Sequence, residues 1–198
     1  MQKSIAFFDF DGTITKKDTM LELARYCAGN LTYTLGMAAI FPWLVSMKLR
    51  LITRTQGKEK FLSHFFGKMS HQQFDDNCLQ FIKNKMPGLI RKEAMNSIQT
   101  HLSDQTTVVV VSASAENWVA PWCTKNNLQF ICTTLEVKDN FITGKLLSNN
   151  CNGNEKVSRI KQLFNLADYK SIYCYGDTSG DKLMLDLATH PFYKSFKK

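Results

Sequence analysis

The sequence of 198 residues contains no cysteine or histidine spacing that is typical of a metal site. Its six cysteines are scattered without a CxxC pair, and its four histidines show no ligand spacing either. The first apolar run begins within the first few residues, so we expect no secretory signal ahead of it. We therefore expect reduced cysteines that serve mainly as small core residues, in a cytoplasmic protein without a zinc centre.

Acidic residues are also few, because 17 Asp and Glu stand against 25 Lys and Arg, which gives a formal charge of +8. This balance favours an anionic partner: a phosphorylated small molecule, an acidic membrane face or a nucleic acid. The sequence lacks a tight Lys/Arg run with interleaved aromatic residues, the pattern that is typical of nucleic-acid binding. We therefore expect no nucleic acid as a partner. Nothing in the sequence indicates an oligomeric state.

Long hydrophobic runs are limited to one uncharged stretch of 17 residues, 31–47. That length is borderline for a membrane span, and Pro42 together with several Thr and Tyr residues weakens such an interpretation. We expect a pair of buried or interfacial helices separated at Pro42, whose apolar face packs against neighbouring helices. A peripheral contact with an anionic membrane, helped by the basic residues that follow, stays open as the alternative.

Hydrophobic residues make up 44% of the chain, including 14 Phe, which is ample for a packed core. The unbroken valines within 107–111 predict a strand buried on both faces, as in a parallel sheet covered by helices. Strand and helix patterns alternate after it, with a hairpin expected over 135–146. We therefore predict a Rossmann-like, three-layer α/β/α core with a parallel sheet.

Helical periodicity extends from the first strand to residue 86, where Pro87 and Gly88 mark a boundary. We expect residues 15–86 to form a helical cap that is inserted into a catalytic core made of residues 1–14 and 87–198. Few residues follow position 181, so the last strand of the sheet is expected to be missing or abbreviated.

Two aspartates, Asp9 and Asp11, follow the strand expected over residues 4–8, and Gly12 allows a sharp turn after them. Ionised carboxylates at this spacing repel one another unless a cation or a shared proton relieves them. The pair therefore indicates metal binding, acid/base chemistry or both. The simpler alternative is an Asp-Gly turn whose side chains cap backbone amides.

Further polar residues follow later strands at the edge where a site would lie. Ser112 directly follows the valine strand, Lys156 opens a helix, and Asp177 and Asp181 follow the last long strand four residues apart. Each also has an ordinary interpretation: a helix N-cap for Ser112, a surface charge for Lys156, and an Asp-rich turn for the last two. Together the four residues and the Asp9–Asp11 pair make a chance arrangement improbable.

In this order the motifs DxDGT, Ser112, Lys156 and GDxxxD resemble the haloacid dehalogenase superfamily of aspartyl-phosphate hydrolases, and the resemblance covers essentially the whole chain. The inserted helices resemble the C1-type cap of its phosphoserine phosphatase-like branch, subfamily IB. Three local stretches strengthen the resemblance: Ser112-Ala113-Ser114, Thr143-Gly144-Lys145-Leu146 and Cys151-Asn152-Gly153-Asn154-Glu155-Lys156. True phosphoserine phosphatases have Ser-Gly-Gly where this chain has Ser112-Ala113-Ser114, so serine phosphate is not the expected substrate.

The resemblance implies a Mg²⁺-dependent phosphatase acting on a phosphorylated small molecule. Asp9 would be the nucleophile that forms an aspartyl-phosphate, and Asp11 the acid and base. Mg²⁺ would be held by the Asp9 carboxylate, the backbone carbonyl of Asp11 and Asp177, with Asp181 behind these ligands and not in contact with the ion. Ser112 and Lys156 would bind the phosphoryl oxygens.

Asp18 and Arg54 resemble, by their offset from the nucleophile, residues that contact the substrate in phosphoserine phosphatases. Two alternatives to a soluble phosphomonoesterase stay open. The first is a membrane-associated lipid-phosphate phosphatase, because the uncharged stretch 31–47 with its basic flank resembles the cap of phosphatidylglycerophosphatases in the same branch. The second is a non-catalytic binding protein that keeps the fold, although such a protein has no need of an acid/base aspartate.

Overall fold

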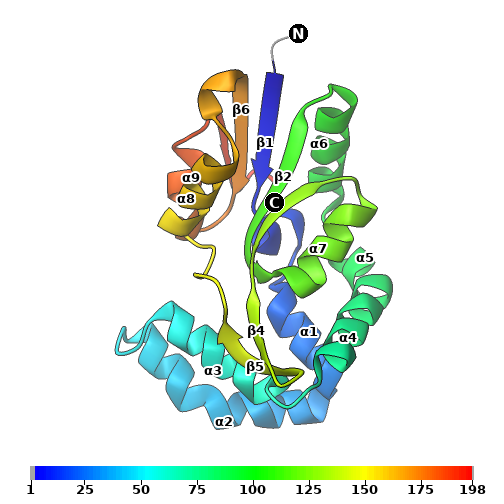
Figure 1. The fold of residues 1–198 in the computed structure, drawn as a ribbon, viewed down its shortest axis with the longest axis vertical. Coiled ribbons are helices and arrows are strands. Elements are labelled where there is room, and N and C mark those ends of the chain that lie inside the picture. Colours follow the sequence, from blue (N-terminus) through cyan, green and yellow to red (C-terminus); the bar gives the residue numbers. More distant parts are fainter. Residues whose placement is uncertain (1–2, 198) are drawn as a thin grey trace.

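A five-stranded parallel sheet forms the centre of the computed structural model, which describes residues 3–197 (Figure 1). Its strand order is β3-β2-β1-β6-β7, and every neighbouring pair is parallel. The strands are β1 Lys3–Phe8, β2 Thr107–Ala115, β3 Gln129–Thr133, β6 Tyr169–Gly176 and β7 His190–Tyr193. This topology confirms the predicted α/β class. It also shows that the last strand is present but short, with four residues.

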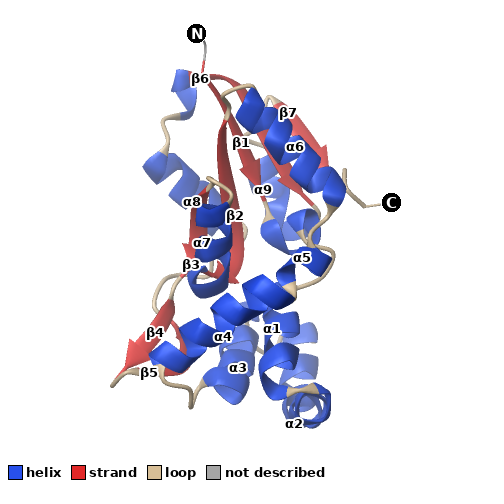
Figure 2. Cartoon of the chain, turned by 90° about the vertical axis from the view of Figure 1, so that its right-hand side faces the viewer, coloured by secondary structure: helices blue, strands red, loops and turns tan. Residues whose placement is uncertain are grey.

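Helices cover both faces of the sheet. Successive side chains of a strand point to opposite sides, so neighbouring residues belong to different cores. Phe8 and Val110 belong to the core on one face, together with residues of α6 and α7, whereas Phe7 and Val109 belong to the core on the other, with α8 and α9. Figure 2 shows the resulting layers. The helices of this part are α5 Met86–Leu89, α6 Lys92–Ser103, α7 Glu116–Lys125, α8 Asn154–Leu163 and α9 Lys182–Leu185.

Four inserted helices lie together beyond the carboxyl ends of β1 and β2 (Figure 1). They are α1 Thr19–Ala28, α2 Asn30–Lys48, α3 Arg54–Phe66 and α4 His71–Asn84. Polar caps begin three of them, at Asp18, Thr53 and Ser70, each of which accepts a hydrogen bond from a backbone amide of the first turn. Gly29 separates α1 from α2 with a positive φ of 76°.

The expected hairpin is confirmed as β4 Leu135–Lys138 and β5 Phe141–Leu146. It packs on the inserted region, because Gly144 lies directly against the backbone of Ser63 in α3 and the amide of Ile142 donates to the carbonyl of Met69, between α3 and α4. A Cβ at Gly144, whose φ is +80°, would come within 2.2 Å of the Ser63 nitrogen. The hairpin is thus attached to the inserted helices, while the division of the chain at residues 14 and 87 stays a prediction.

Two expectations about the inserted region are wrong. The stretch 31–47 is not a helix pair, since α2 runs unbroken through Pro42. Proline removes one backbone hydrogen bond; here Pro42 and Ala38, whose carbonyl would have accepted it, are both exposed to water. The apolar residues of α2 are also not all packed inside, because Leu31, Leu35 and others remain exposed.

Helix α6 begins only at Lys92, because Ile90 is extended and forms an antiparallel bridge with Thr15. Residues 86–89 form the separate short helix α5. None of the helices that the structure describes between residues 3 and 197 is long and apolar enough to cross a lipid bilayer.

Candidate active site

Asp9 and Asp177 meet at the carboxyl edge of the sheet, directly after the neighbouring strands β1 and β6. A wide turn over Phe10–Ile14 brings the backbone of Gly12 against Asp177. Gly12 has a φ of +86°, and a Cβ there would lie 2.5 Å from Asp177 Oδ2. Only glycine fits this turn without moving that carboxylate.

Lys156 joins two of the carboxylates in the interior. Its Nζ lies 2.6 Å from Asp9 Oδ1 and 2.8 Å from Asp181 Oδ1, and the side chain is fully buried in the first turn of α8. Burial alone would lower the pKa of Lys156, but the two carboxylates raise it above its usual range. The lysine is therefore charged and fixed in place.

Asp181 has both carboxylate oxygens occupied. Oδ1 accepts from Lys156, while Oδ2 accepts from the amide of Thr178 at 2.9 Å, from its hydroxyl at 2.7 Å and from the amide of Asp177 at 3.2 Å. Burial would raise the pKa of Asp181, but Lys156 and Thr178 hold it below its ordinary value. This geometry suits a residue that positions its neighbours.

Asp9 is destabilised as an anion. Burial raises the pKa of Asp9 to about 7 and outweighs the lowering by Lys156, with the charges of Asp181 and Asp11 adding to the rise. Oxygens of Asp9, Asp177 and Asp181 lie within 4.8 Å of one another, all three side chains being buried. Buried, mutually repelling carboxylates with oxygen-only donors fit a hard divalent cation such as Mg²⁺.

The hydroxyl of Thr13 links the carboxylates of Asp9 and Asp177. Its Oγ1 lies 3.1 Å from both Asp9 Oδ2 and Asp177 Oδ1. Since one hydroxyl proton can serve only one acceptor at a time, the remaining carboxylate oxygen keeps a free lone pair. The other oxygen of Asp177 contacts the ammonium of Lys197.

Asp11 is held beside Asp9 by residues from two elements. Its Oδ1 accepts from the amide of Thr19 at 2.6 Å and from the hydroxyl at 2.7 Å, and its Oδ2 accepts from Ser114 Oγ at 2.5 Å. Trp118 Nε1 donates to the same Thr19 hydroxyl at 2.9 Å. These contacts fix the Asp11 carboxyl group at the wall of a cavity.

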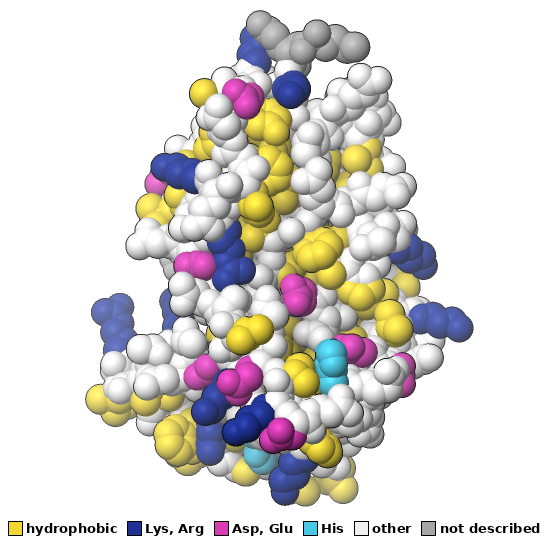
Figure 3. Space-filling view, in the orientation of Figure 1, with side chains coloured by type: hydrophobic (Ala, Val, Ile, Leu, Met, Phe, Trp, Pro, Cys, Tyr) yellow, Lys and Arg dark blue, Asp and Glu magenta, His cyan; other side chains and the backbone are white. Residues whose placement is uncertain are grey.

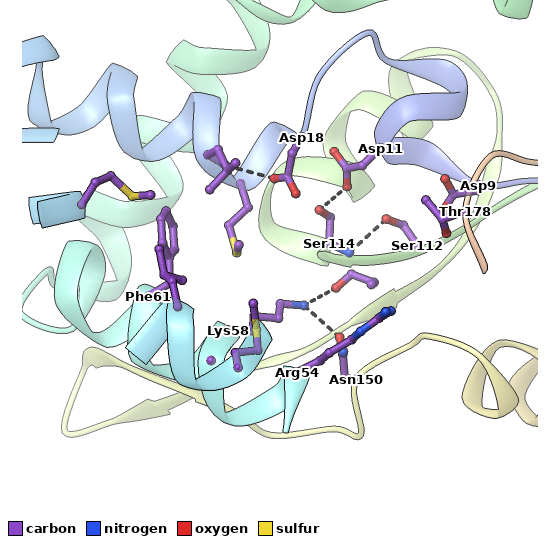
Figure 4. Close-up of a pocket in the computed structure, with 17 residues that line it drawn as sticks. Asp9, Asp11, Asp18, Arg54, Lys58, Phe61, Ser112, Ser114, Asn150 and Thr178 are labelled. Atoms are coloured by element: carbon purple, nitrogen blue, oxygen red, sulfur yellow. Dashed lines mark hydrogen bonds between the residues drawn. The ribbon is translucent and has the colours of Figure 1, made fainter. Parts of the chain in front are cut away.

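This cavity has a volume of about 490 Å³ and lies between the sheet edge and the inserted helices (Figure 4). Asp9, Asp11 and Ser112 line the end next to the sheet. Ser112 is buried, and its Oγ accepts from the amide of Ser114 at 2.9 Å. The apolar wall opposite comes from the inserted helices, through Met20, Leu21, Met37, Leu44, Met47 and Phe61.

Asp18 and Arg54, expected from the family resemblance, both line the cavity on the side of the inserted helices. Asp18 also caps α1, because its Oδ1 accepts from the amide of Leu21 at 3.1 Å. Partial burial and the nearby Asp11 carboxylate raise the pKa of Asp18, although its side chain is still open to solvent. Arg54 is the exposed first residue of α3. Contact of either residue with a substrate stays a prediction.

Lys58 was not expected from the sequence. It extends from α3 across the cavity and donates to the carbonyl of Ala113 and to Asn150 Oδ1 at 3.0 Å (Figure 4). Burial lowers the pKa of Lys58 to about 8, against the opposing charges of Asp11 and Asp18. A lysine on a helix of a basic chain gives no sequence signal that separates it from a surface charge.

The structure thus places the expected site residues in two adjoining groups. Asp9, Asp177, Asp181 and Lys156 form the buried cluster, while Asp11, Ser112, Asp18 and Arg54 line the cavity. Thr13 and Ser114 stand within the motifs that the sequence identified, but their hydrogen bonds to the aspartates depend on the three-dimensional turn.

Comparison with known proteins gives consistent matches. The family model described as haloacid dehalogenase-like hydrolase matches residues 6–186. Protein CicA from Caulobacter vibrioides is 30% identical over 194 residues, covering 96% of this chain and 85% of the relative.

Two solved structures share the fold. A protein of unknown function from Bordetella pertussis Tohama I superposes with a TM-score of 0.84 at 20% identity, covering 96% of this chain and 88% of the other. A substrate-bound phosphoserine phosphatase has a TM-score of 0.68 at 20% identity, with 95% and 84% coverage.

Proposed function

Because the chain belongs to the haloacid dehalogenase-like hydrolases, we propose that it is a Mg²⁺-dependent phosphatase that hydrolyses a phosphomonoester through an aspartyl-phosphate intermediate. One observation carries the proposal: the buried Asp9 is bound to Lys156 at 2.6 Å and opens, together with Asp11, into a single cavity. A nucleophile, a fixed cation and an acid/base group are the parts that phosphoryl transfer requires. The likeness to a substrate-bound phosphoserine phosphatase supports the same reaction class.

In the first step a carboxylate oxygen of Asp9 attacks phosphorus, and the bond from phosphorus to the alcohol oxygen breaks. Asp11 gives its proton to that leaving oxygen, so that a neutral alcohol departs. Lys156 and Ser112 bind the phosphoryl oxygens and offset their negative charge, which is the main requirement of this chemistry. The hydrogen bonds from Thr19 and Ser114 keep the Asp11 carboxyl group directed at the cavity.

In the second step water replaces the alcohol. Asp11, now ionised, accepts a proton from the water, whose oxygen attacks the phosphorus of the intermediate. The bond between phosphorus and the Asp9 oxygen breaks, inorganic phosphate leaves, and Asp9 is restored as a carboxylate. The protonated Asp11 is then ready for the next substrate.

The carboxylates of Asp9 and Asp177 and the backbone carbonyl of Asp11 would hold the Mg²⁺, with Asp181 behind them. When bound, the ion offsets the combined negative charge of the carboxylates and the phosphoryl group. The raised pKa of Asp9 supports this assignment, since Lys156 alone does not keep Asp9 fully ionised near neutral pH. Asp181 would act by orienting Lys156 and the backbone at Asp177.

Residues 15–86 would form the cap that selects the substrate. The contact between the hairpin and α3 supports counting residues 135–146 with that cap. Asp18 and Arg54, at the cap side of the cavity, would contact the part of the substrate that leaves as the alcohol.

A lipid phosphate is the second candidate substrate, and one observation favours it. Six apolar side chains of the inserted helices form the cavity wall opposite Asp9, as given above, so a small polar alcohol would leave that wall without a partner. An amphiphilic phosphomonoester would cover it. A purely binding role has no comparable support, because it does not require Asp11 beside Asp9.

The test is a phosphate-release assay on purified protein with Mg²⁺, over phosphoserine, sugar phosphates and phosphatidylglycerophosphate. We expect turnover of at least one class and an acid-stable, hydroxylamine-sensitive phosphoenzyme after rapid quenching. Asp139→Asn, on the exposed hairpin turn, is the control and should turn over as the wild type does. Turnover without a trapped phosphoenzyme would reject the covalent mechanism, and no turnover across the panel would favour the binding role.

A further inference from the structure

Helix α2 is apolar around most of its circumference but is covered on one side only. Within α2, all of which the structure describes, only Tyr33, Gly36 and Ile40 are buried. Leu31 is 75% exposed, Leu35 62%, Phe41 62% and Val45 37%, followed by Leu49 at 65%. We call these five residues the outer face of α2. A helix that is apolar all round is normally buried, so this exposure requires an explanation.

The spacing of these residues gathers them on one side. Helical spacing places four of them on the same side of the helix and Phe41 at the border of that side; the four are Leu31, Leu35, Val45 and Leu49. The opposite side is already engaged: Met37, Leu44 and Met47 line the cavity, and Met47 lies against Gly57 of α3. The inner side therefore holds α2 on the protein, and the outer face is free to contact another surface.

Basic residues flank the outer face. The sequence from 23 to 58 contains no Asp or Glu, and Lys48, Arg50 and Arg54 are exposed, whereas Arg25 pairs with Glu22 at 3.3 Å. Leu51, 74% exposed, lies between Arg50 and Arg54. In Figure 3 hydrophobic side chains gather at the lower end of the molecule, where Figure 1 places α2, with Lys and Arg side chains close by. The stretch 23–58 thus combines exposed apolar area with positive charge and contains no acidic residue of its own.

We propose that the outer face of α2 docks on an anionic lipid bilayer, with its apolar side chains at the boundary of the acyl chains and the basic flank at the headgroups. A bilayer supplies both an apolar layer and a negative surface, which matches this combination. A second copy of the chain matches it less well. A symmetric dimer would pair the outer face with itself, so the basic flank would meet no acidic residue of the same stretch.

Docking in this way places the active site beside the headgroups. Leu44 and Met47 lie on the same helix as the outer face but line the cavity that contains Asp9. A helix is only about 10 Å wide, so the phosphate of a bilayer amphiphile would have a short distance to travel. This consequence for the substrate rests on the proposed function, whereas the docking surface itself does not.

The experiment is flotation of the full chain with vesicles, using Asp9→Asn protein in parallel so that binding is measured without turnover. Vesicles of phosphatidylcholine with phosphatidylglycerol are compared with pure phosphatidylcholine, at low and at high salt. The test variant is Leu35→Glu with Val45→Glu. Its matched control is Leu147→Glu with Leu163→Glu, because those two leucines are 69% and 65% exposed outside the inserted helices.

We expect both active and Asp9→Asn proteins to float with anionic vesicles at low salt, and binding to fall at least about tenfold at high salt or in the α2 variant. The control variant should float as the wild type does. Circular dichroism and the melting temperature report that each variant is folded. Absence of flotation at low salt, or equal flotation of the two double variants, would overturn the proposal.

Light scattering tests whether a second copy of the chain occupies the outer face of α2 instead. Concentration-dependent dimers that dissociate in the α2 variant, without any vesicle binding, would assign the outer face to a second copy and also overturn the proposal. Loss of phosphatase activity with flotation retained would instead count against the proposed function alone.

Discussion

Lys197 Nζ lies 2.5 Å from Asp177 Oδ2, so the segment after β7 contacts a carboxylate that is proposed to hold Mg²⁺. Several contacts hold that segment in place. The ring of Phe196 stacks on that of Tyr175, and the backbone carbonyl of Phe196 accepts a hydrogen bond from Arg91 Nη1 at 3.0 Å. The ammonium is therefore positioned by packing and partly neutralises Asp177.

Replacing this lysine should change the affinity for Mg²⁺. In Lys197→Met the carboxylate of Asp177 loses a competing cation, and we expect Mg²⁺ to bind about two- to fivefold more tightly, in line with a partly exposed ion pair. Isothermal titration with MgCl₂ measures the change. Lys194→Met, whose lysine lies over the Tyr193 ring, serves as the control and should leave the affinity unaltered. Weaker binding in Lys197→Met would show that the lysine orients Asp177 for the metal.

Asp9→Asn should abolish turnover, because a neutral amide neither attacks phosphorus nor ligates Mg²⁺ well. We expect less than a tenth of the wild-type kcat, measured as phosphate release under saturating substrate. Retention of more than about a tenth, a barrier change of only ~1.4 kcal/mol, is incompatible with Asp9 as the nucleophile.

Asp11→Asn and Asp177→Asn should separate chemistry from metal binding. In Asp11→Asn the backbone carbonyl remains, so we expect Mg²⁺ affinity to stay near that of the wild type while kcat falls by roughly 10²-fold or more. Asp177→Asn should lose most of the affinity. Titration and steady-state kinetics on the same preparations provide both values. An equal loss of affinity in the two variants would make the Asp11 side chain a ligand.

The stability of the Mg²⁺-free protein should depend on pH through Asp9. Burial raises the pKa of Asp9 from 3.8 to about 7, so between these values the folded protein holds a proton that the unfolded chain releases. The associated stability is present at low pH and is lost as the pH rises through 7. We measure the free energy of unfolding in urea with a chelator present. The value for Asp9→Asn minus that for the wild type should be larger at pH 8 than at pH 5, by on the order of 2 kcal/mol.

Asp139→Asn, on the exposed hairpin turn, controls for general effects of removing a charge. Its difference from the wild type should be the same at both pH values. A difference for Asp9→Asn that also stays constant would mean that the pKa of Asp9 is not raised.

The parts of the site that sequence motifs indicate are those that directly follow strands. Asp9 and Asp177 come after apolar runs, and parallel strands bring their carboxyl ends to one edge whatever the details of packing. The same reasoning predicts the sheet and the hairpin. It does not depend on how the inserted helices are placed.

Residues that reach the site only through the packing of separate elements could not be predicted. Lys58 bonds to Ala113 and Asn150 only because α3 lies over the sheet edge, and Lys197 reaches Asp177 only because Phe196 packs on Tyr175. The sequence leaves the exposure of α2 open for a related reason. An apolar stretch indicates burial, but the sequence does not specify the surface that covers it.

The chain crosses between the sheet and the inserted helices in two places, and each crossing consists of two paired segments. At one, Thr15 bridges Ile90, supported by the amide of Lys16 on the carbonyl of Leu89. At the other, the amide of Leu147 donates to the carbonyl of Thr134 at the base of the hairpin. If the helices move relative to the sheet, the two paired connections would favour rocking about the line that joins them, since twisting would break both pairs. Substrate entry and product release would then share one axis of motion.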